Sequence, residues 1–300
     1  MRVLRRRRSR KEAGSSRRKQ DGFSAVLLFL KKFSGDPIFS RMKIESYVRN
    51  EKEATALSEV QSCFQRIEKK YLLTYDQYEA MRTGMEKYVK PDAYSHYTIC
   101  NIYYDTDDFY LIRNSLEKPV FKEKLRVRSY GVPTGTDRVF VELKKKYDGV
   151  VYKRRITLQT GEAVRYLSGS PLRQPSQISR EIDWFMNHYR PHPAAFIGYD
   201  REAFAGRENP DLRVTFDTNL RGRNRELDLR MGSHGDLIIP QDRILMELKI
   251  PGSAPLWLVH LLSENGIFAS SFSKYGTYYK QLLGAVTSYG KYHKEARRYA

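Results

Sequence analysis

The sequence predicts an α+β protein, mostly antiparallel β, in which flanking helices surround a barrel with a charged interior. The first observation is the stretch Phe121–Tyr130, where Lys122, Lys124, Arg126 and Arg128 alternate with bulkier residues. Side chains of a strand alternate between its two faces, so one face of this strand is strongly basic. The second observation is that charged pairs of one parity recur in other apolar runs, at Glu142/Lys144, Lys153/Arg155, Arg213/Asp217 and Glu247/Lys249.

Strand formers in period-two patterns, separated by turn residues, predict an antiparallel arrangement. Asp148-Gly149 between two such runs is a strong hairpin signal. We expect strands at residues 65–73, 96–104, 120–130, 138–146, 150–158, 194–204, 212–220, 237–239 and 244–250, with a further short one near Asp228.

Helical signals fall between these strands. Thr74 and Gln77 have capping-box spacing, and apolar residues follow at helical intervals. Pro191 and Gly266 are stop signals for two later helices. We expect helices at residues 74–85, 109–116, 161–167, 179–189, 255–264 and 272–283. The sequence therefore predicts one folded domain over residues 61–290, followed by a tail at 291–300.

The net charge of +19 is concentrated at the amino terminus. Residues 1–20 hold ten Lys or Arg residues against one acid, Glu12, which leaves +10 on the remainder. We expect residues 1–60 to be a disordered basic leader with a short helical prelude after residue 20. The alternative for the leader is an arm that binds nucleic acid or a membrane.

The two cysteines, Cys63 and Cys100, have no metal-type spacing, and no signal peptide is visible. Residues 23–30 are apolar but far shorter than the roughly 20 residues of a spanning helix. The expected location is therefore the cytoplasm. No common nucleotide-binding motif, such as the phosphate loop with its Gly-Lys-Ser/Thr ending, occurs in the chain.

Several strands that each carry a basic stripe predict an interior that holds a polyanion. Buried lysines and arginines repel one another unless anions compensate them, and phosphate oxygens suit both side chains. Interspersed acids, namely Glu68, Glu142, Asp217 and Glu247, fit as counter-charges or as ligands of Mg²⁺ or Mn²⁺. The plainer interpretation is a set of solvated strand faces. A second alternative is a nucleic-acid-binding module, although basic residues alternating with acids are not typical of one.

These residues resemble the polyphosphate polymerase (VTC) domain, a branch of the triphosphate tunnel metalloenzymes related to the CYTH phosphatases. The resemblance follows the chain in order from about residue 64 to 285. It is carried by Arg66-x-Glu68-x-Lys70-Tyr71, Leu125-Arg-Val-Arg128, Val141-Glu-Leu-Lys144, Tyr152-Lys-Arg-Arg155, Tyr199-Asp-Arg201, Arg213-x-Thr-x-Asp217, Met246-Glu-Leu-Lys249 and Phe272-Ser-Lys-Tyr275.

The resemblance implies an eight-stranded antiparallel tunnel that binds a nucleotide triphosphate with a divalent cation, Mn²⁺ or Mg²⁺. It implies Glu247 as the metal ligand. It also implies a set of catalytic, phosphate-binding cations, of which Arg126, Arg128, Lys144, Arg213 and Lys274 would hold the nucleotide; the full set is Lys70, Arg126, Arg128, Lys144, Lys153, Arg155, Arg201, Arg213, Lys249 and Lys274.

The implied activity is an ATP:polyphosphate phosphotransferase with ATP and polyphosphate as its partners. Arg66 stands where hydrolytic relatives have the first Glu of Glu-x-Glu-x-Lys, which favours transfer over hydrolysis. The main alternative is a CYTH-type triphosphatase acting on inorganic or nucleoside triphosphates. Neither a phosphate-sensing SPX domain nor membrane helices are visible, so export of the product would need a separate membrane partner. No nucleic acid is expected as a partner.

Overall fold

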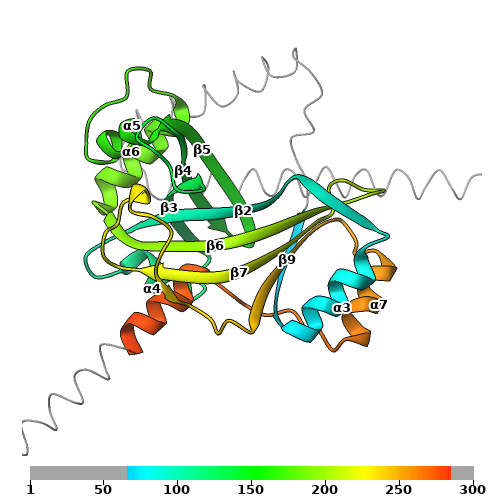
Figure 1. The fold of residues 1–300 in the computed structure, drawn as a ribbon. Helices are drawn as coiled ribbons and strands as arrows, with labels where there is room; N and C mark the ends of the chain where they lie inside the picture. Colours follow the sequence, from blue (N-terminus) through cyan, green and yellow to red (C-terminus); the bar gives the residue numbers. More distant parts are fainter. Residues whose placement is uncertain (1–65, 285–300) are drawn as a thin grey trace, which may run out of the picture. The chain divides into compact units, whose positions relative to one another are not determined.

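The computed structural model describes residues 66–284, which fall within one compact unit of the chain. The leader expected at 1–60 and the tail expected at 291–300 lie outside the described residues. Figure 1 shows a long, twisted sheet with helices packed on it. The strands are β1 (Arg66–Thr74), β2 (Val89–Asp105), β3 (Phe121–Tyr130), β4 (Arg138–Tyr147), β5 (Val150–Gln159), β6 (His192–Gly206), β7 (Arg213–Arg223), β8 (Asp236–Leu237) and β9 (Arg243–Pro251).

The helices are placed largely as the sequence predicts. They are α3 (Tyr75–Met85), α4 (Tyr110–Leu116), α5 (Thr160–Leu167), α6 (Gln177–Tyr189), α7 (Leu256–Glu264) and a last helix over residues 274–284. The capping box predicted at the start of α3 is confirmed, since Thr74 and Gln77 exchange both hydrogen bonds. The short strand expected near Asp228 is wrong, because this residue instead caps a 3-10 turn at Leu229–Met231.

The sheet is antiparallel, which confirms the predicted fold class. Eight strands follow one path in the order β1-β9-β7-β6-β2-β3-β4-β5, and β8 pairs with β7 beside it. Asp148 and Gly149 both have positive φ, as the predicted β4–β5 hairpin requires. The expectation of a closed barrel is wrong in one respect. The end strands β1 and β5 are not hydrogen-bonded to each other, so the sheet is open.

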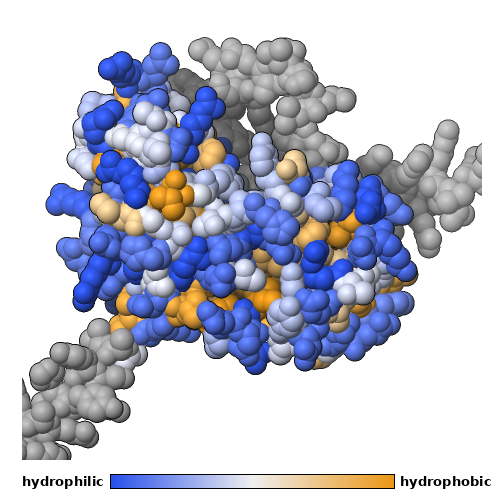
Figure 2. All heavy atoms as spheres, in the orientation of Figure 1, coloured by the Kyte–Doolittle hydropathy of each residue, from blue (hydrophilic) through white to orange (hydrophobic). Residues whose placement is uncertain are grey.

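The period-two pattern sorts the side chains of this sheet onto two faces. The outer face is apolar and carries two cores. One core packs α3 and α7 on β1, β7 and β9 around Phe216, and the other packs α5 and α6 on β2, β3 and β4 around Phe196. Figure 1 shows these two helix pairs at opposite ends of the sheet. Figure 2 shows a mostly hydrophilic surface with apolar residues in small areas, as burial of these two cores requires.

The inner face carries the charged side chains of the same strands and a third core. Tyr275, Tyr278 and Tyr279 of the last helix pack there against residues of β2, β6 and β9. The hydroxyl of Tyr275 donates to Asp105, at 2.9 Å, and Asp105 also accepts two backbone N–H groups at the start of α4. These contacts hold the amino-terminal end of the last helix, and with it Lys274, over the inner face.

The inner face is strongly curved. In a flat sheet β1 and β4 would lie about 29 Å apart, which is six strand spacings of about 4.8 Å. Yet one short segment contacts both sides of the sheet: Ser270 pairs with Lys70 of β1, and Ser273 accepts a hydrogen bond from Lys124 of β3, the neighbour of β4. The sheet therefore curls until its two ends face each other across the charged side chains.

No helix among residues 66–284 is long and apolar enough to cross a membrane.

Candidate active site

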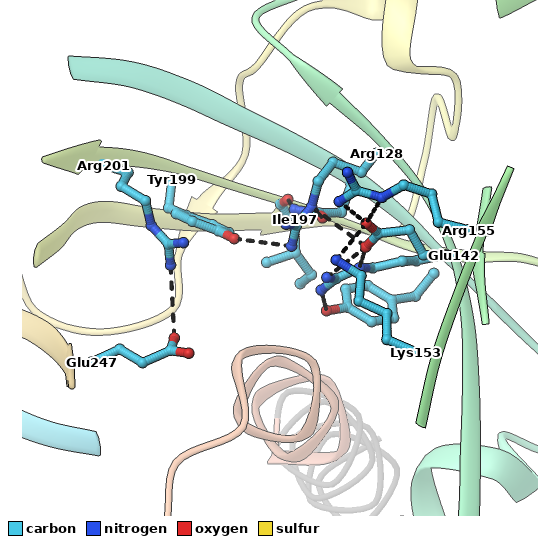
Figure 3. A network of polar contacts seen from close by, with 11 residues as sticks. Arg128, Glu142, Lys153, Arg155, Ile197, Tyr199, Arg201 and Glu247 are labelled. Carbon is cyan, nitrogen blue, oxygen red and sulfur yellow. Dashed lines mark hydrogen bonds and ion pairs between the residues drawn. The ribbon is translucent and has the colours of Figure 1, made fainter. Parts of the chain in front are cut away.

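Charged side chains of the inner face form two clusters; Figure 3 shows the first, around Glu142, on one side of Tyr199, and Arg201 of the second on the other side. The first cluster surrounds Glu142 of β4, and the second surrounds Asp217 of β7. Each carboxylate is almost completely buried, and each is in contact with at least two cations. The Glu142 and Asp217 clusters are the centre of the candidate site.

The Glu142 cluster gathers cations from β3 and β5, the two strands that flank β4. Arg126 donates to Glu142 Oε2 through Nε at 2.8 Å, and the Lys153 ammonium lies 2.8 Å from Oε1. Arg155 donates to Oε1 through Nε at 2.7 Å and makes a second contact through its Nη2. Arg128 lies at 3.9 Å. Burial would raise the pKa of Glu142, but Arg126, Arg128 and Lys153 outweigh it and hold the pKa below its usual value.

One carboxylate cannot neutralise four cations, so the Glu142 cluster keeps an excess of positive charge. Its arginines are held in place by neutral groups as well. Arg128 donates to Asn101 Oδ1 at 2.9 Å, and Arg126 donates to the Tyr103 hydroxyl at 3.0 Å. Fixed guanidinium groups with uncompensated charge are a preorganised site for phosphate oxygens.

The Asp217 cluster joins β6, β7 and the last helix. Arg201 binds both oxygens of Asp217, at 2.6 and 2.8 Å, and the Lys274 ammonium lies 2.6 Å from Oδ2. Arg201 also lies 3.7 Å from Glu247. The ring of Tyr199 lies beneath both cations, at 4.3 Å from Lys274 and 5.2 Å from Arg201.

Tyr199 also connects the two clusters, because its hydroxyl accepts a hydrogen bond from Arg128 at 3.4 Å. A ligand that touches both clusters would lie across this tyrosine. The positive charges are therefore arranged along a line on the inner face, from the arginines of β3 and β5 to those of β6.

A pair of carboxyl groups lies beside the Asp217 cluster. Glu68 and Glu247 are within hydrogen-bonding reach of each other, and Lys70 lies 3.2 Å from Glu68. Burial disfavours the charged form of Lys70, but Glu247 and Glu68 outweigh this and raise its pKa. Two adjacent carboxylates repel each other unless a cation lies between or beside them.

This carboxyl pair fits a divalent cation that is held partly by its substrate. Among residues 66–284, no group of three or more His, Cys, Asp or Glu side chains could bind a metal by protein ligands alone. Mg²⁺ is commonly bound by one or two carboxylates together with substrate phosphates and water. Glu247 and Glu68 supply that number of hard oxygen ligands, with Arg201 of the Asp217 cluster 3.7 Å from Glu247.

Four of the predicted cations, Lys70, Lys144, Arg213 and Lys249, contact neither Glu142 nor Asp217 in the ion pairs described above. Arg213 is on the same face but pairs with Asp92, and Lys249 is half-buried in β9 opposite Arg213. Lys144 is exposed on the inner face, yet burial and the charges of Lys70 and Arg126 lower its pKa, with Glu68 and Glu247 opposing the shift.

The chain matches the VTC domain over residues 65–283, which is most of its length and includes every strand described above. The chain belongs to the VTC domain family. No curated protein sequence matches it.

Solved structures similar to this VTC domain include a proposed adenylate cyclase from Bacillus halodurans, with 15% identity and a TM-score of 0.45. That alignment covers 69% of this chain and 93% of the other. A Hippeastrum protein proposed as an adenylyl cyclase, for which a dominant triphosphatase activity is described, has 15% identity and a TM-score of 0.42. Here the coverage is 72% of this chain and 96% of the other.

Some side chains of the VTC domain site were not singled out as site residues from the sequence. Glu142 and Asp217 were expected to be counter-charges or metal ligands, and each proves to be the centre of a cluster of cations. Asn101, Tyr103 and Tyr199 hold the arginines through neutral contacts. The charge pattern gives no signal for these three, because their strands β2 and β6 have few charged residues on the inner face.

Proposed function

We propose that this VTC domain transfers the terminal phosphate of ATP to a growing polyphosphate chain. The observation that supports the proposal is the line of two clusters, in which fixed arginines from β3, β5 and β6 exceed the carboxylates between them. A donor nucleotide and an acceptor chain that lie end to end would use both clusters.

Phosphoryl transfer depends mainly on alignment of the reacting groups and on neutralisation of charge on the transferred phosphoryl group. In this proposal Arg126, Arg128 and Arg155 hold one set of phosphates, and Arg201 with Lys274 holds the other. Asp217 and Glu142 fix the directions of these cations. The acceptor is an already ionised phosphate, so no side chain needs to remove a proton from it.

Glu247 and Glu68 are the side chains that would hold the divalent cation, which would supply Lewis-acid chemistry by withdrawing charge from the phosphoryl group. Lys70 beside them would contact the same phosphate group, and its charge helps to keep the pKa of Glu68 below the usual value. The choice between Mn²⁺ and Mg²⁺ follows from the activity test below.

A second candidate function is hydrolysis of inorganic or nucleoside triphosphates. The carboxyl pair Glu68 and Glu247 favours it, because paired carboxylates can orient and activate a water molecule as well as hold a cation. The two functions use the same donor site and differ in whether a phosphate chain or water accepts the phosphoryl group.

The deciding experiment incubates the purified 300-residue protein with ATP as sole phosphate donor, in separate reactions with Mn²⁺ and Mg²⁺. Products are resolved on a gel stained for polyphosphate, and free phosphate is measured in parallel. A ladder of lengthening chains supports the polymerase. Stoichiometric free phosphate with no chain, for both metals, supports the triphosphatase and rejects the polymerase.

Removal of a cation from the Glu142 or Asp217 cluster should slow turnover far more than removal of an inner-face cation that belongs to neither cluster. Lys274→Ala should reduce kcat/KM for ATP about tenfold or more, since a charged hydrogen bond contributes about 1.5–3 kcal/mol. The matched control is Arg213→Ala, which also removes one cation from the inner face. It should reduce kcat/KM less than Lys274→Ala does, because Arg213 pairs with Asp92. Steady-state kinetics of the two variants would test this, and an equal loss in both would contradict the assignment.

Phosphate binding should weaken as pH rises through about 8. Burial and neighbouring cations lower the pKa of Lys124 to about 8, although Tyr103 opposes the shift. The same causes lower the pKa of Lys153 to about 8, although Glu142 opposes that shift. Both lysines lose charge above that pH, so the affinity for tripolyphosphate should be highest below it.

The free energy of unfolding of the ligand-free protein should rise with pH, whereas the affinity for tripolyphosphate should fall. The folded-state pKa values of Lys124 and Lys153 lie below the ordinary value of 10.5, so the unfolded chain binds more protons between about 8 and 10.5. The free energy of unfolding should gain from these lysines as pH rises through this window. Titration calorimetry and chemical denaturation at several pH values would measure both effects. The double variant K124Q/K153Q should flatten both curves, and an unchanged pH dependence would contradict this origin.

A further inference from the structure

The inner face of β3, β4 and β5 carries its side chains in transverse rows that the strand register defines. The row nearest the Glu142 carboxylate is Arg126, Glu142 and Arg155, directly opposite one another. One step further along the strands, the row is Lys124, Lys144 and Lys153, and the next row is Lys122, Lys146 and Val151. Successive rows lie about 7 Å apart, which is two residues of an extended strand.

The arginine row and the lysine rows differ in their balance of charge. In the arginine row a carboxylate lies between two cations, whereas the lysine rows contain no acid. Lys124 faces Lys144, and Lys122 faces Lys146, as cross-strand neighbours. Like charges in directly opposite positions destabilise a sheet. We name these four residues, Lys122, Lys124, Lys144 and Lys146, the lysine ladder.

The contacts of the lysine ladder leave most of this repulsion uncompensated. Lys122 donates to the backbone carbonyl of Ser115 at 3.0 Å, and Lys124 donates to the Ser273 hydroxyl at 3.5 Å, both neutral acceptors. Burial, together with Lys146, Lys118 and Lys144, lowers the pKa of Lys122.

The carboxyl groups that act on the lysine ladder are Glu68 and Glu247, which only partly oppose the lowering of the pKa of Lys144 by burial, Lys70 and Arg126. These two carboxyl groups are the ones assigned above to the divalent cation. When the divalent cation is bound, these carboxyl groups compensate the charge of that cation. An anionic ligand would then have to neutralise the lysine ladder.

We propose that the lysine ladder binds a linear polyphosphate chain beyond the two clusters and directs it out of the site toward the β4–β5 hairpin. This inference rests on the proposed function and adds the path of the chain. The rows of cations continue those of the Glu142 cluster without a break, so one extended polyanion can contact both. The ladder ends beside Asp148 and Gly149, where the hairpin closes that end of the sheet.

The ladder favours polyphosphate over a single-stranded nucleic acid. Proteins that bind single strands combine cations with aromatic rings on which bases stack. The aromatic residues nearest in sequence, Phe121, Tyr147 and Tyr152, occupy the opposite parity of their strands, and the inner-face position that completes the outer row is Val151. Lysine ammonium groups alone suit a chain that offers only phosphate oxygens.

The test compares two probes, tripolyphosphate and long-chain polyphosphate, on the full-length protein. The variant is K122Q/K146Q, which removes the outer row. The matched control is K69Q/R180Q, which removes the same charge from exposed positions on the outer side of β1 and on α6. Titration calorimetry gives the affinity of each probe, and the measured quantity is the ratio of the two affinities.

The wild-type protein should prefer the long chain, and K122Q/K146Q should lower the preference about tenfold, as expected for two lost charged contacts in a water-accessible site. The control should keep the wild-type ratio. Without ligand, K122Q/K146Q should also melt at a higher temperature than wild type, because a like-charge pair is removed.

An unchanged affinity ratio in K122Q/K146Q, with tripolyphosphate still bound, would overturn the ladder inference and leave the proposed function standing. Failure of wild type to bind tripolyphosphate at all would instead overturn the proposed function. Displacement of long-chain polyphosphate by single-stranded RNA of equal charge at the same concentration would overturn the assignment of the ligand class.

Discussion

Glu247→Gln should abolish most of the divalent-cation-dependent turnover while the fold persists. The neutral amide is a poor ligand for a hard cation, and the charge stabilisation that a bound cation provides is worth several kcal/mol, so we expect a loss of about a hundredfold or more. The fold should survive because the neighbours of Glu247 keep other partners. Arg201 retains both hydrogen bonds to Asp217, and Lys70 retains Glu68.

Turnover with ATP across a Mn²⁺ titration would measure this effect, together with Mn²⁺ affinity in the presence of tripolyphosphate. Glu208→Gln, which removes an exposed carboxylate in the turn before β7, is the matched control and should behave as wild type. Full activity with an unchanged Mn²⁺ requirement in Glu247→Gln would show that the ligand is another carboxylate, with Glu68 the next to test.

Glu142→Gln should destabilise the free protein strongly. Four cations contact a side chain that is 1% exposed, and loss of one partner from a buried ion pair costs about 3–5 kcal/mol because the remaining charge is left without compensation. Chemical denaturation should therefore show a clear decrease in the free energy of unfolding. Glu208→Gln again provides the control for loss of one carboxylate.

Added polyanion should reverse much of that loss. The Glu142→Gln cluster has a larger excess of positive charge, so tripolyphosphate should raise its melting temperature by more than it raises that of wild type. A residue that only supports the fold would show equal ligand-induced shifts in both proteins, and that result would separate Glu142 from the phosphate-binding cations.

The charged face itself could be predicted because alternation along a strand is a local property. Lys124, Arg126 and Arg128 reveal their common face from sequence alone, and the same holds for Lys153 with Arg155. The register between neighbouring strands, in contrast, is not a local property of the sequence. That Glu142 lies opposite both Arg126 and Arg155 depends on how β3, β4 and β5 align, and this alignment makes Glu142 the centre of a cluster.

Contacts between distant segments were beyond the sequence pattern. Lys274 became a candidate only through the family resemblance, since its position over Asp217 depends on the packing of the last helix on the inner face. Tyr199 and Asn101 act through neutral hydrogen bonds, which no charge pattern indicates. The closed barrel was wrong because strand alternation specifies faces and does not specify whether β1 and β5 meet.

The pairing of β1 with β9 also determines the order in which this site can form. Strands β3, β4 and β5 are consecutive and joined by short turns, so the Glu142 cluster can assemble from local contacts early in folding. Glu68 and Lys70 meet Glu247 only after nearly the whole described chain has been synthesised, because β1 and β9 come from its opposite ends. A nascent chain thus exposes its arginines and lysines to cellular polyanions before the carboxyl pair is complete. The Glu142 cluster can therefore complete its contacts before the last strand of the sheet pairs with the first.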